Sequence, residues 1–170
     1  MLKRVLIVVG VFAALFVVGK LIGFDNVWAR VAGPPDLGPV DFRGLEKGPK
    51  PNQALVCPPQ LCDPASVDVE SPVYALDAKR LAQAARSALQ ALPGSERVDD
   101  GSQDTTLRFV VRTSLMQFPD TVVVEAVEGT AQGTAHIAIY SRSQIGYSDM
   151  GANLKRVRAI LASLAQHEAS

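Results

Sequence analysis

Cysteine and histidine are both scarce in this chain, which contains two of each among 170 residues. A structural zinc site needs about four nitrogen or sulfur ligands, and no histidine lies near Cys57 and Cys62. The sequence therefore predicts no metal site, and no motif in it indicates a cofactor. An excess of one charge is also missing, because 17 basic and 17 acidic residues give a formal net charge of zero. Without a basic surplus, nothing favours nucleic acid as a partner.

The two cysteines flank Pro58-Pro59-Gln60-Leu61, so their spacing differs from the Cys-x-x-Cys pair of thiol redox enzymes. In an oxidising compartment, the simplest interpretation of Cys57 and Cys62 is a structural disulfide. The loop that it closes is short, so the bond would stabilise the fold by only about 2 kcal/mol. A catalytic pair is the alternative hypothesis.

The first 24 residues are typical of a membrane anchor. Residues 1–4 form a short positive head, and residues 5–24 carry no charge except Lys20. About 20 helical residues suffice to span a bilayer at ~1.5 Å per residue. We expect an uncleaved signal-anchor over residues 5–24, with residues 1–4 in the cytoplasm and the rest of the chain outside it. A cleaved signal peptide is the alternative, but Val27-Trp28-Ala29 and Val31-Ala32-Gly33 are poor cleavage sites.

A segment rich in proline and glycine follows the anchor. Residues 25–64 contain Pro34-Pro35, Gly38-Pro39, Gly48-Pro49, Pro51, Pro58-Pro59 and Pro64. Proline at this density disfavours helices and central strands alike. We expect residues 25–64 to form an extended linker that leads to one globular domain over residues 65–168.

The hydrophobic periodicity of residues 65–168 predicts a helix near each end of the domain. Asp77 is a suitable N-cap for a helix that continues to about Leu92. The last helix should begin after Ser148 or Asp149 and end by about His167. Apolar residues recur on one side of each helix, so both helices are expected to pack against a common core.

Between the two helices, alternating apolar and polar residues predict strands over 105–116, 121–127 and 134–141, with a shorter strand at 96–99. The short connections predict an antiparallel meander. The expected fold is therefore α+β, with three or four antiparallel strands covered on one face by two helices. Val110 and Val123 are candidates for an exposed apolar patch on the other face.

The segment from Ser141 to Arg156 holds more hydroxyls, glycines and charges than any other part of the chain. The structural interpretation is a capped turn in which Asn153 and Arg156 tie the last helix to the sheet. The binding interpretation uses free N–H groups at a helix start, with an arginine adding a contact to a polar or anionic group. The candidate ligand-binding residues are Arg142, Ser143, Gly146, Tyr147, Asp149, Asn153 and Arg156.

An enzymatic interpretation has less support. Ser141 or Ser143 could serve as a nucleophile with His136 and Asp149, but no Gly-x-Ser-x-Gly elbow accompanies them. A histidine on a strand is more often a half-buried packing residue. The sequence therefore leans against catalysis.

The same segment resembles the domain of unknown function family 1499. The family pattern of Ser-x-Ser-Arg, Gly, Tyr-Ser-Asp and Gly-x-Asn-x-x-Arg falls on Ser141, Ser143, Gly146, Tyr147, Ser148, Asp149, Gly151, Asn153 and Arg156. Phe118-Pro119-Asp120 resembles the Phe-x-Asp bend of that family, and residues 52–62 and 71–74 resemble its entry segment. Gln144 departs from the pattern, which usually has an arginine there. The resemblance spans residues 50–165 and implies a bacterial envelope or organelle protein with no assigned activity.

These features favour a membrane-anchored, periplasm-facing binding or interaction module, held in the bacterial inner membrane by residues 5–24. Besides the membrane, the expected partner is a polar or anionic ligand or an envelope protein. The alternatives are an envelope hydrolase that uses Ser143 or Ser141 and a purely structural component of an envelope complex.

Overall fold

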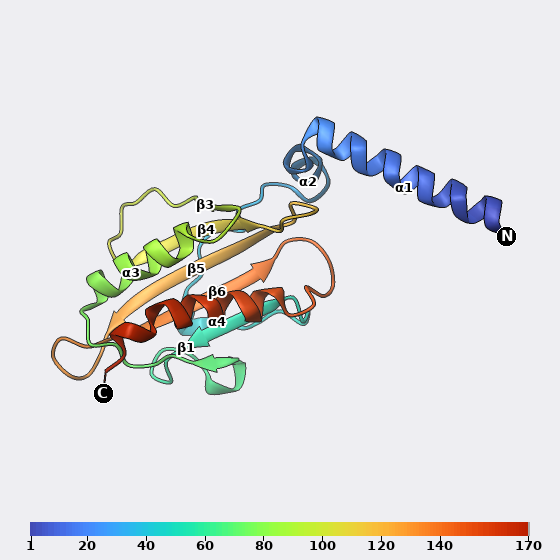
Figure 1. The fold of residues 1–170 in the computed structure, drawn as a ribbon. Coiled ribbons are helices and arrows are strands. Elements are labelled where there is room, and N and C mark those ends of the chain that lie inside the picture. The colour runs from blue at the N-terminus through green and yellow to red at the C-terminus, as the bar shows by residue number, and fades with distance from the viewer. Residues whose placement is uncertain (170) are drawn as a thin grey trace.

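The computed structural model of the protein describes residues 1–169 and begins with a long apolar helix. α1 (Leu2–Ile22) contains a 20-residue stretch, Lys3–Ile22, that is long and apolar enough to cross a membrane. Only 6% of that stretch is buried, and Figure 1 shows α1 projecting away from the sheet. An apolar helix in this position has little protein surface against which it could be buried.

A second, shorter helix joins α1 to the folded domain. Phe24, which we expected inside the membrane span, begins α2 (Phe24–Ala32) instead, after a turn at Gly23 with a φ of 87°. The indole Nε1 of Trp28 donates a hydrogen bond of 2.6 Å to the carbonyl of Met116. The Trp28 ring also lies 4.7 Å from the Phe118 ring, measured between centroids. Because residues 113–118 hold α2 in this way, they fix where α1 leaves the domain.

The domain is built on one six-stranded sheet in the order β2-β1-β6-β5-β4-β3. Its strands are β1 (Gln53–Cys57), β2 (Val69–Glu70), β3 (Ser95–Arg97), β4 (Thr106–Arg112), β5 (Pro119–Glu128) and β6 (Ala135–Ser143). β3 to β6 form an antiparallel meander, β1 pairs antiparallel with β6, and β2 pairs parallel with β1. The expectation of three or four strands was therefore wrong, because the sheet continues past β6 into the proline-rich segment.

Two helices cover one face of this sheet, as expected (Figure 1). α3 (Ala78–Gln90) has Asp77 as its N-cap, whose carboxylate accepts from the Arg80 N–H at 2.8 Å. α4 (Ala152–Leu164) follows β6 and continues into a short 3-10 helix, η3 (Ala165–His167). The shared core contains the buried residues Leu81, Leu89, Phe109, Ile137, Ile139, Val157, Ile160 and Leu164. Burial of each large side chain stabilises the fold by roughly 1.5–3 kcal/mol.

The opposite face of the sheet is covered by the segment that precedes β1. Phe42, in the 3-10 helix η1 (Phe42–Gly44), is 1% exposed and packs with Val123, Ala138 and Tyr140. Polar contacts fasten the same segment, since Arg108 pairs with Asp36 at 2.9 Å and Thr121 donates to the Pro35 carbonyl at 3.3 Å. The disulfide between Cys57 and Cys62, near a third 3-10 helix η2 (Pro64–Ser66), belongs to this smaller core.

Two expectations are corrected by this second layer. Val110 and Val123 are 0% and 1% exposed, so the predicted open apolar face is covered. Residues 25–64, the expected linker, also do not extend away from the domain, because they contribute most of α2, all of β1 and the cover formed by Phe42. The physical reason is that an apolar sheet face must be buried against something. The apolar residues between the prolines supply that cover.

Candidate functional site

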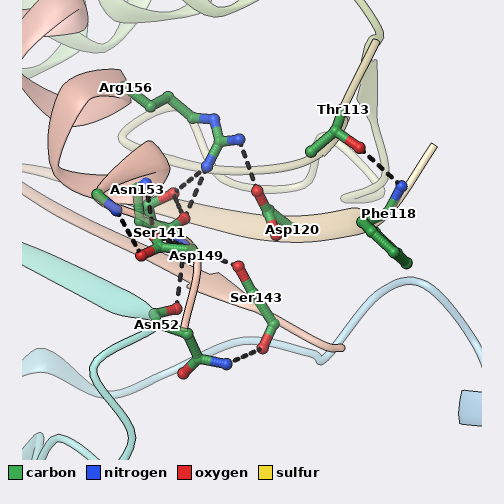
Figure 2. Close-up of polar contacts among 10 residues, drawn as sticks. Asn52, Thr113, Phe118, Asp120, Ser141, Ser143, Asp149, Asn153 and Arg156 are labelled. Carbon is green, nitrogen blue, oxygen red and sulfur yellow. Dashed lines mark hydrogen bonds and ion pairs between the residues drawn. The ribbon is translucent and has the colours of Figure 1, made fainter. Parts of the chain in front are cut away.

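The polar residues around the start of α4 meet beneath its first turn (Figure 2). They come from β5, from β6, from α4, from the loop between β6 and α4 and from the residue just before β1. We call Asn52, Asp120, Ser141, Ser143, Asp149, Asn153 and Arg156 the polar cluster. Four of its members are almost inaccessible, since Asn52, Asp120, Ser141 and Asn153 are all buried. Buried polar groups of this kind are costly unless each finds a hydrogen-bond partner.

Asn153 is the centre of the polar cluster and is fully buried. Its Nδ2 lies 2.9 Å from Ser143 Oγ, 3.0 Å from the Asn52 carbonyl and 2.7 Å from Asp149 Oδ2. Its Oδ1 accepts from Ser141 Oγ at 2.5 Å and from Arg156 Nη1 at 2.7 Å. An amide nitrogen has two protons, so the three acceptors share them. This one side chain therefore joins α4 to β6 and to the residue before β1.

Arg156 forms the charged part of the polar cluster. Its Nη2 lies 2.6 Å from Asp120 Oδ2, and its Nη1 donates to Ser141 Oγ at 2.9 Å. The Arg156 and Asp120 side chains are only 10% and 3% exposed. A buried ion pair is tolerated when further hydrogen bonds satisfy both partners. Here the guanidinium is satisfied by groups of the protein itself, which leaves it poorly placed to attract an external anion.

Asp149 satisfies the first N–H groups of α4. Its Oδ1 accepts from the Gly151 N–H at 2.9 Å and its Oδ2 from the Asn153 N–H at 2.7 Å. Burial by itself raises the pKa of the Asp149 carboxyl, but these N–H groups and the Asn153 amide outweigh it and hold the pKa below its ordinary value. The helix begins at Ala152, later than expected, and Asp149 still acts on its first turn. The positive end of the helix is thus already neutralised.

The polar cluster also shapes two neighbouring loops. We call residues 113–118 the β4–β5 loop and residues 144–151 the β6–α4 loop. In the β6–α4 loop, the Gly146 carbonyl accepts from Asn52 Nδ2 at 3.0 Å. In the β4–β5 loop, the Phe118 N–H donates to Thr113 Oγ1 at 3.0 Å (Figure 2). A groove of about 260 Å³ separates the loops and is lined in part by Phe118, Ile145 and Met150.

The structure brings together Ser143, Asp149, Asn153 and Arg156 of the candidate ligand-binding residues and adds Gly146 through its carbonyl. Arg142 lies apart, because it alternates with Ser141 and Ser143 and so faces the other side of the sheet. There its Nη2 donates to the Leu37 carbonyl at 2.9 Å. Tyr147 is 71% exposed. The arrangement matches the structural interpretation, in which Asn153 and Arg156 tie α4 to the sheet.

Two members of the polar cluster, Asn52 and Asp120, were not among the candidate residues. Asn52 lay inside the segment assigned to the linker, and periodicity does not indicate that its carbonyl would meet Asn153, 101 residues later. Asp120 is the last residue of the predicted bend Phe118-Pro119-Asp120, where a carboxylate normally faces water. The only sequence signal for either residue was the resemblance, which included the Phe-x-Asp bend and the entry segment.

Gln144 contacts the segment after α2. Its Nε2 lies 2.9 Å from the Ala32 carbonyl and 2.5 Å from the Pro34 carbonyl. The β6–α4 loop is therefore attached to the same segment that leads from the apolar helix to the sheet.

Comparison with known proteins identifies the family. No curated protein matches the chain. The profile of the family described as "Protein of unknown function (DUF1499)" matches residues 50–164, which extend from just before β1 to the end of α4. This range includes every member of the polar cluster and both loops. The chain therefore belongs to the DUF1499 family.

Proposed function

We propose that the chain is a single-pass protein of the bacterial inner membrane whose DUF1499 domain acts as an interaction module on the periplasmic side. The observation that carries the proposal is the exposed apolar surface of α1. Only 6% of its spanning stretch is buried, and the helix carries few charges. Such a surface is stable in a bilayer and unfavourable in water. Lys3 and Arg4 at its amino end favour retention of that end in the cytoplasm. The disulfide between Cys57 and Cys62 is in keeping with an oxidising compartment.

The polar cluster is poorly suited to bind an external ligand. We therefore favour an interaction role for the domain. Arg156 is paired with Asp120, and the N–H groups at the start of α4 are occupied by Asp149. A polar or anionic ligand would have to displace these contacts, at the cost of leaving buried groups without partners. The polar cluster supports instead a rigid domain end that presents two loops.

The hydrolase alternative is not favoured by the placement of its residues. Ser141 is fully buried and its hydroxyl contacts Asn153 and Arg156. His136 and Ser141 lie five residues apart on β6, so they are roughly 16 Å apart along the strand and face opposite sides of the sheet. A general base must lie within hydrogen-bond reach of its nucleophile. The same alternation places His136 and Ser143 on opposite faces.

Reporter fusions after Ser170 test the proposed topology. Alkaline phosphatase folds into an active enzyme outside the cytoplasm, whereas green fluorescent protein becomes fluorescent inside it. We expect an active phosphatase fusion, a dark fluorescent-protein fusion and retention of the full chain in the membrane after alkaline extraction. A matched chain without residues 1–22 should reverse all three results. A bright fluorescent fusion of the full chain, or its release by alkaline extraction, would contradict the proposal.

A further inference from the structure

Large exposed apolar side chains are concentrated at one end of the domain. After residue 33, the exposed members of this class among the described residues are Leu37, Val73, Leu115, Tyr147 and Met150. The three most exposed are Leu115 at 63%, Tyr147 at 71% and Met150 at 99%. Leu115 belongs to the β4–β5 loop, and Tyr147 and Met150 belong to the β6–α4 loop. Exposed apolar groups gathered in this way indicate a contact surface.

The same two loops contain unusual backbone conformations. Gln117 and Met150 have φ values of 54° and 53°, and they are the non-glycine residues with positive φ within residues 1–169. This region of conformational space is unfavourable for a residue with a side chain such as methionine. In water, an almost fully exposed Met150 gains no packing in return. Strained residues of this kind collect at functional positions.

Transfer of both loops from water to a less polar environment has little electrostatic cost. Residues 113–118 and 144–151 contain one charged side chain, Asp149. Its carboxylate accepts hydrogen bonds from Gly151 and Asn153 within the polar cluster. The polar cluster and the Thr113 contact also hold the loops in place. Ordering them against a new surface therefore costs little conformational entropy.

The position of α1 identifies that surface. Trp28 attaches α2 to the β4–β5 loop, and Gln144 attaches the segment after α2 to the β6–α4 loop. Gly23 is the single residue between α1 and α2. Figure 1 shows both loops at the end of the sheet where α1 departs, whereas the hairpin between β5 and β6 and the C-terminus lie at the other end. A membrane that contains α1 lies beside the two loops.

We propose that Leu115, Tyr147 and Met150 insert into the interfacial layer of the bilayer that α1 spans. The domain then rests on the membrane through two loops and does not stand away from it on a tether. Tyrosine is enriched at bilayer interfaces, where its ring is buried and its hydroxyl stays hydrated. Leucine and methionine supply apolar surface for the acyl-chain boundary. The lipid surface is favoured over a protein partner because it continues the apolar surface of α1. This inference rests on the proposed function.

Site-specific fluorescence in proteoliposomes of the full chain tests the inference. The two native cysteines are bonded to each other, so one added cysteine is a unique site for a bimane label. The test positions are Leu115→Cys, Tyr147→Cys and Met150→Cys. The matched control is Gln132→Cys, an exposed position in the hairpin between β5 and β6, at the end of the sheet away from α1. It shows whether the label by itself causes insertion into the bilayer. Val11→Cys, on the exposed surface of α1, reports whether α1 lies in lipid.

Each labelled chain is compared in plain phosphatidylcholine vesicles and in vesicles whose acyl chains carry bromine both near the headgroup and near the methyl end. We expect the three loop labels and the Val11 label to lose most of their fluorescence in brominated vesicles, while the Gln132 label keeps its intensity. If the Val11 label is quenched and the loop labels behave like the Gln132 label, the inference is overturned and the anchor stands. If the Val11 label is not quenched, α1 does not lie in the bilayer, and both the proposed function and this inference fail.

Discussion

Replacing Arg156 with methionine should destabilise the domain strongly, because the change removes a buried charge and leaves its partner in place. Methionine keeps most of the apolar stem of arginine, so little packing is lost. The Asp120 side chain, 3% exposed, loses the guanidinium that lies 2.6 Å from its Oδ2. Breaking one side of a buried ion pair costs about 3–5 kcal/mol. That loss is a large part of the free energy of unfolding of a whole domain, which is typically about 5–15 kcal/mol.

A second variant separates the charge effect from simple loss of packing. Asp120→Asn combined with Arg156→Met leaves no buried charge, so the remaining cost should be about 1–2 kcal/mol for an imperfectly bonded amide. The double variant should therefore be more stable than Arg156→Met alone. Such non-additivity is expected of residues in direct contact.

Urea denaturation of the full chain in mild detergent, followed by far-UV circular dichroism, measures both effects. With a slope of about 2 kcal/mol per molar urea, the midpoint of Arg156→Met should fall by about 2 M. Arg158→Met is the matched control, because Arg158 is exposed on the same helix and its replacement should change stability by less than ~0.5 kcal/mol. If Arg156→Met behaves like Arg158→Met, or if the double variant is no better than the single one, Arg156 is not a structural residue and the ligand-binding interpretation regains support.

Three further changes test other parts of the structure with the same denaturation assay. Met150→Asn should raise the free energy of unfolding by about 1 kcal/mol, because asparagine tolerates the left-handed backbone better than methionine; a loss of stability would show that Met150 packs within the domain. Asp149→Asn should flatten the pH dependence of stability. The lowered pKa of Asp149 in the folded state contributes stability above the unfolded value of about 3.9, and this contribution is lost as pH falls through the folded pKa. Equal slopes for both chains below about pH 5 would contradict that account. Phe42→Ala should cost about 3–5 kcal/mol, because the ring is 1% exposed in the smaller core; an unchanged midpoint would mean that the cover on this face is dispensable.

Much of the local structure could be predicted from periodicity. The strand predicted over 134–141 is confirmed as β6, in which Ala135, Ile137 and Ile139 face the helices and Ala138 and Tyr140 face the other side. The Asp77 cap and the helix that follows it are confirmed. These features depend on neighbours within a few residues, so a short window of sequence contains the information.

The strand β1 shows where such windows fail. Gln53–Cys57 lies between prolines and contains five residues, too few for a clear period. Its partner is β6, which follows more than 80 residues later and pairs Leu55 with Tyr140. Only the exposed edge of β6 and the apolar second face of the sheet make a strand and a cover favourable there. A count of prolines therefore predicted a linker where the fold places a strand.

The candidate site divides in the same way. The sequence by itself determined that a polar, glycine-rich turn joins the last strand to the last helix, and that an apolar helix precedes the domain, because composition and local spacing decide both. Only the tertiary structure decided that Arg156 is paired with Asp120, that Asn153 joins three segments, and that Leu115 lies at the same end as Tyr147 and Met150. The physical reason is that hydrogen bonds and ion pairs between distant residues depend on the register of β5 against β6 and on the docking of α4, which no short segment of the chain encodes.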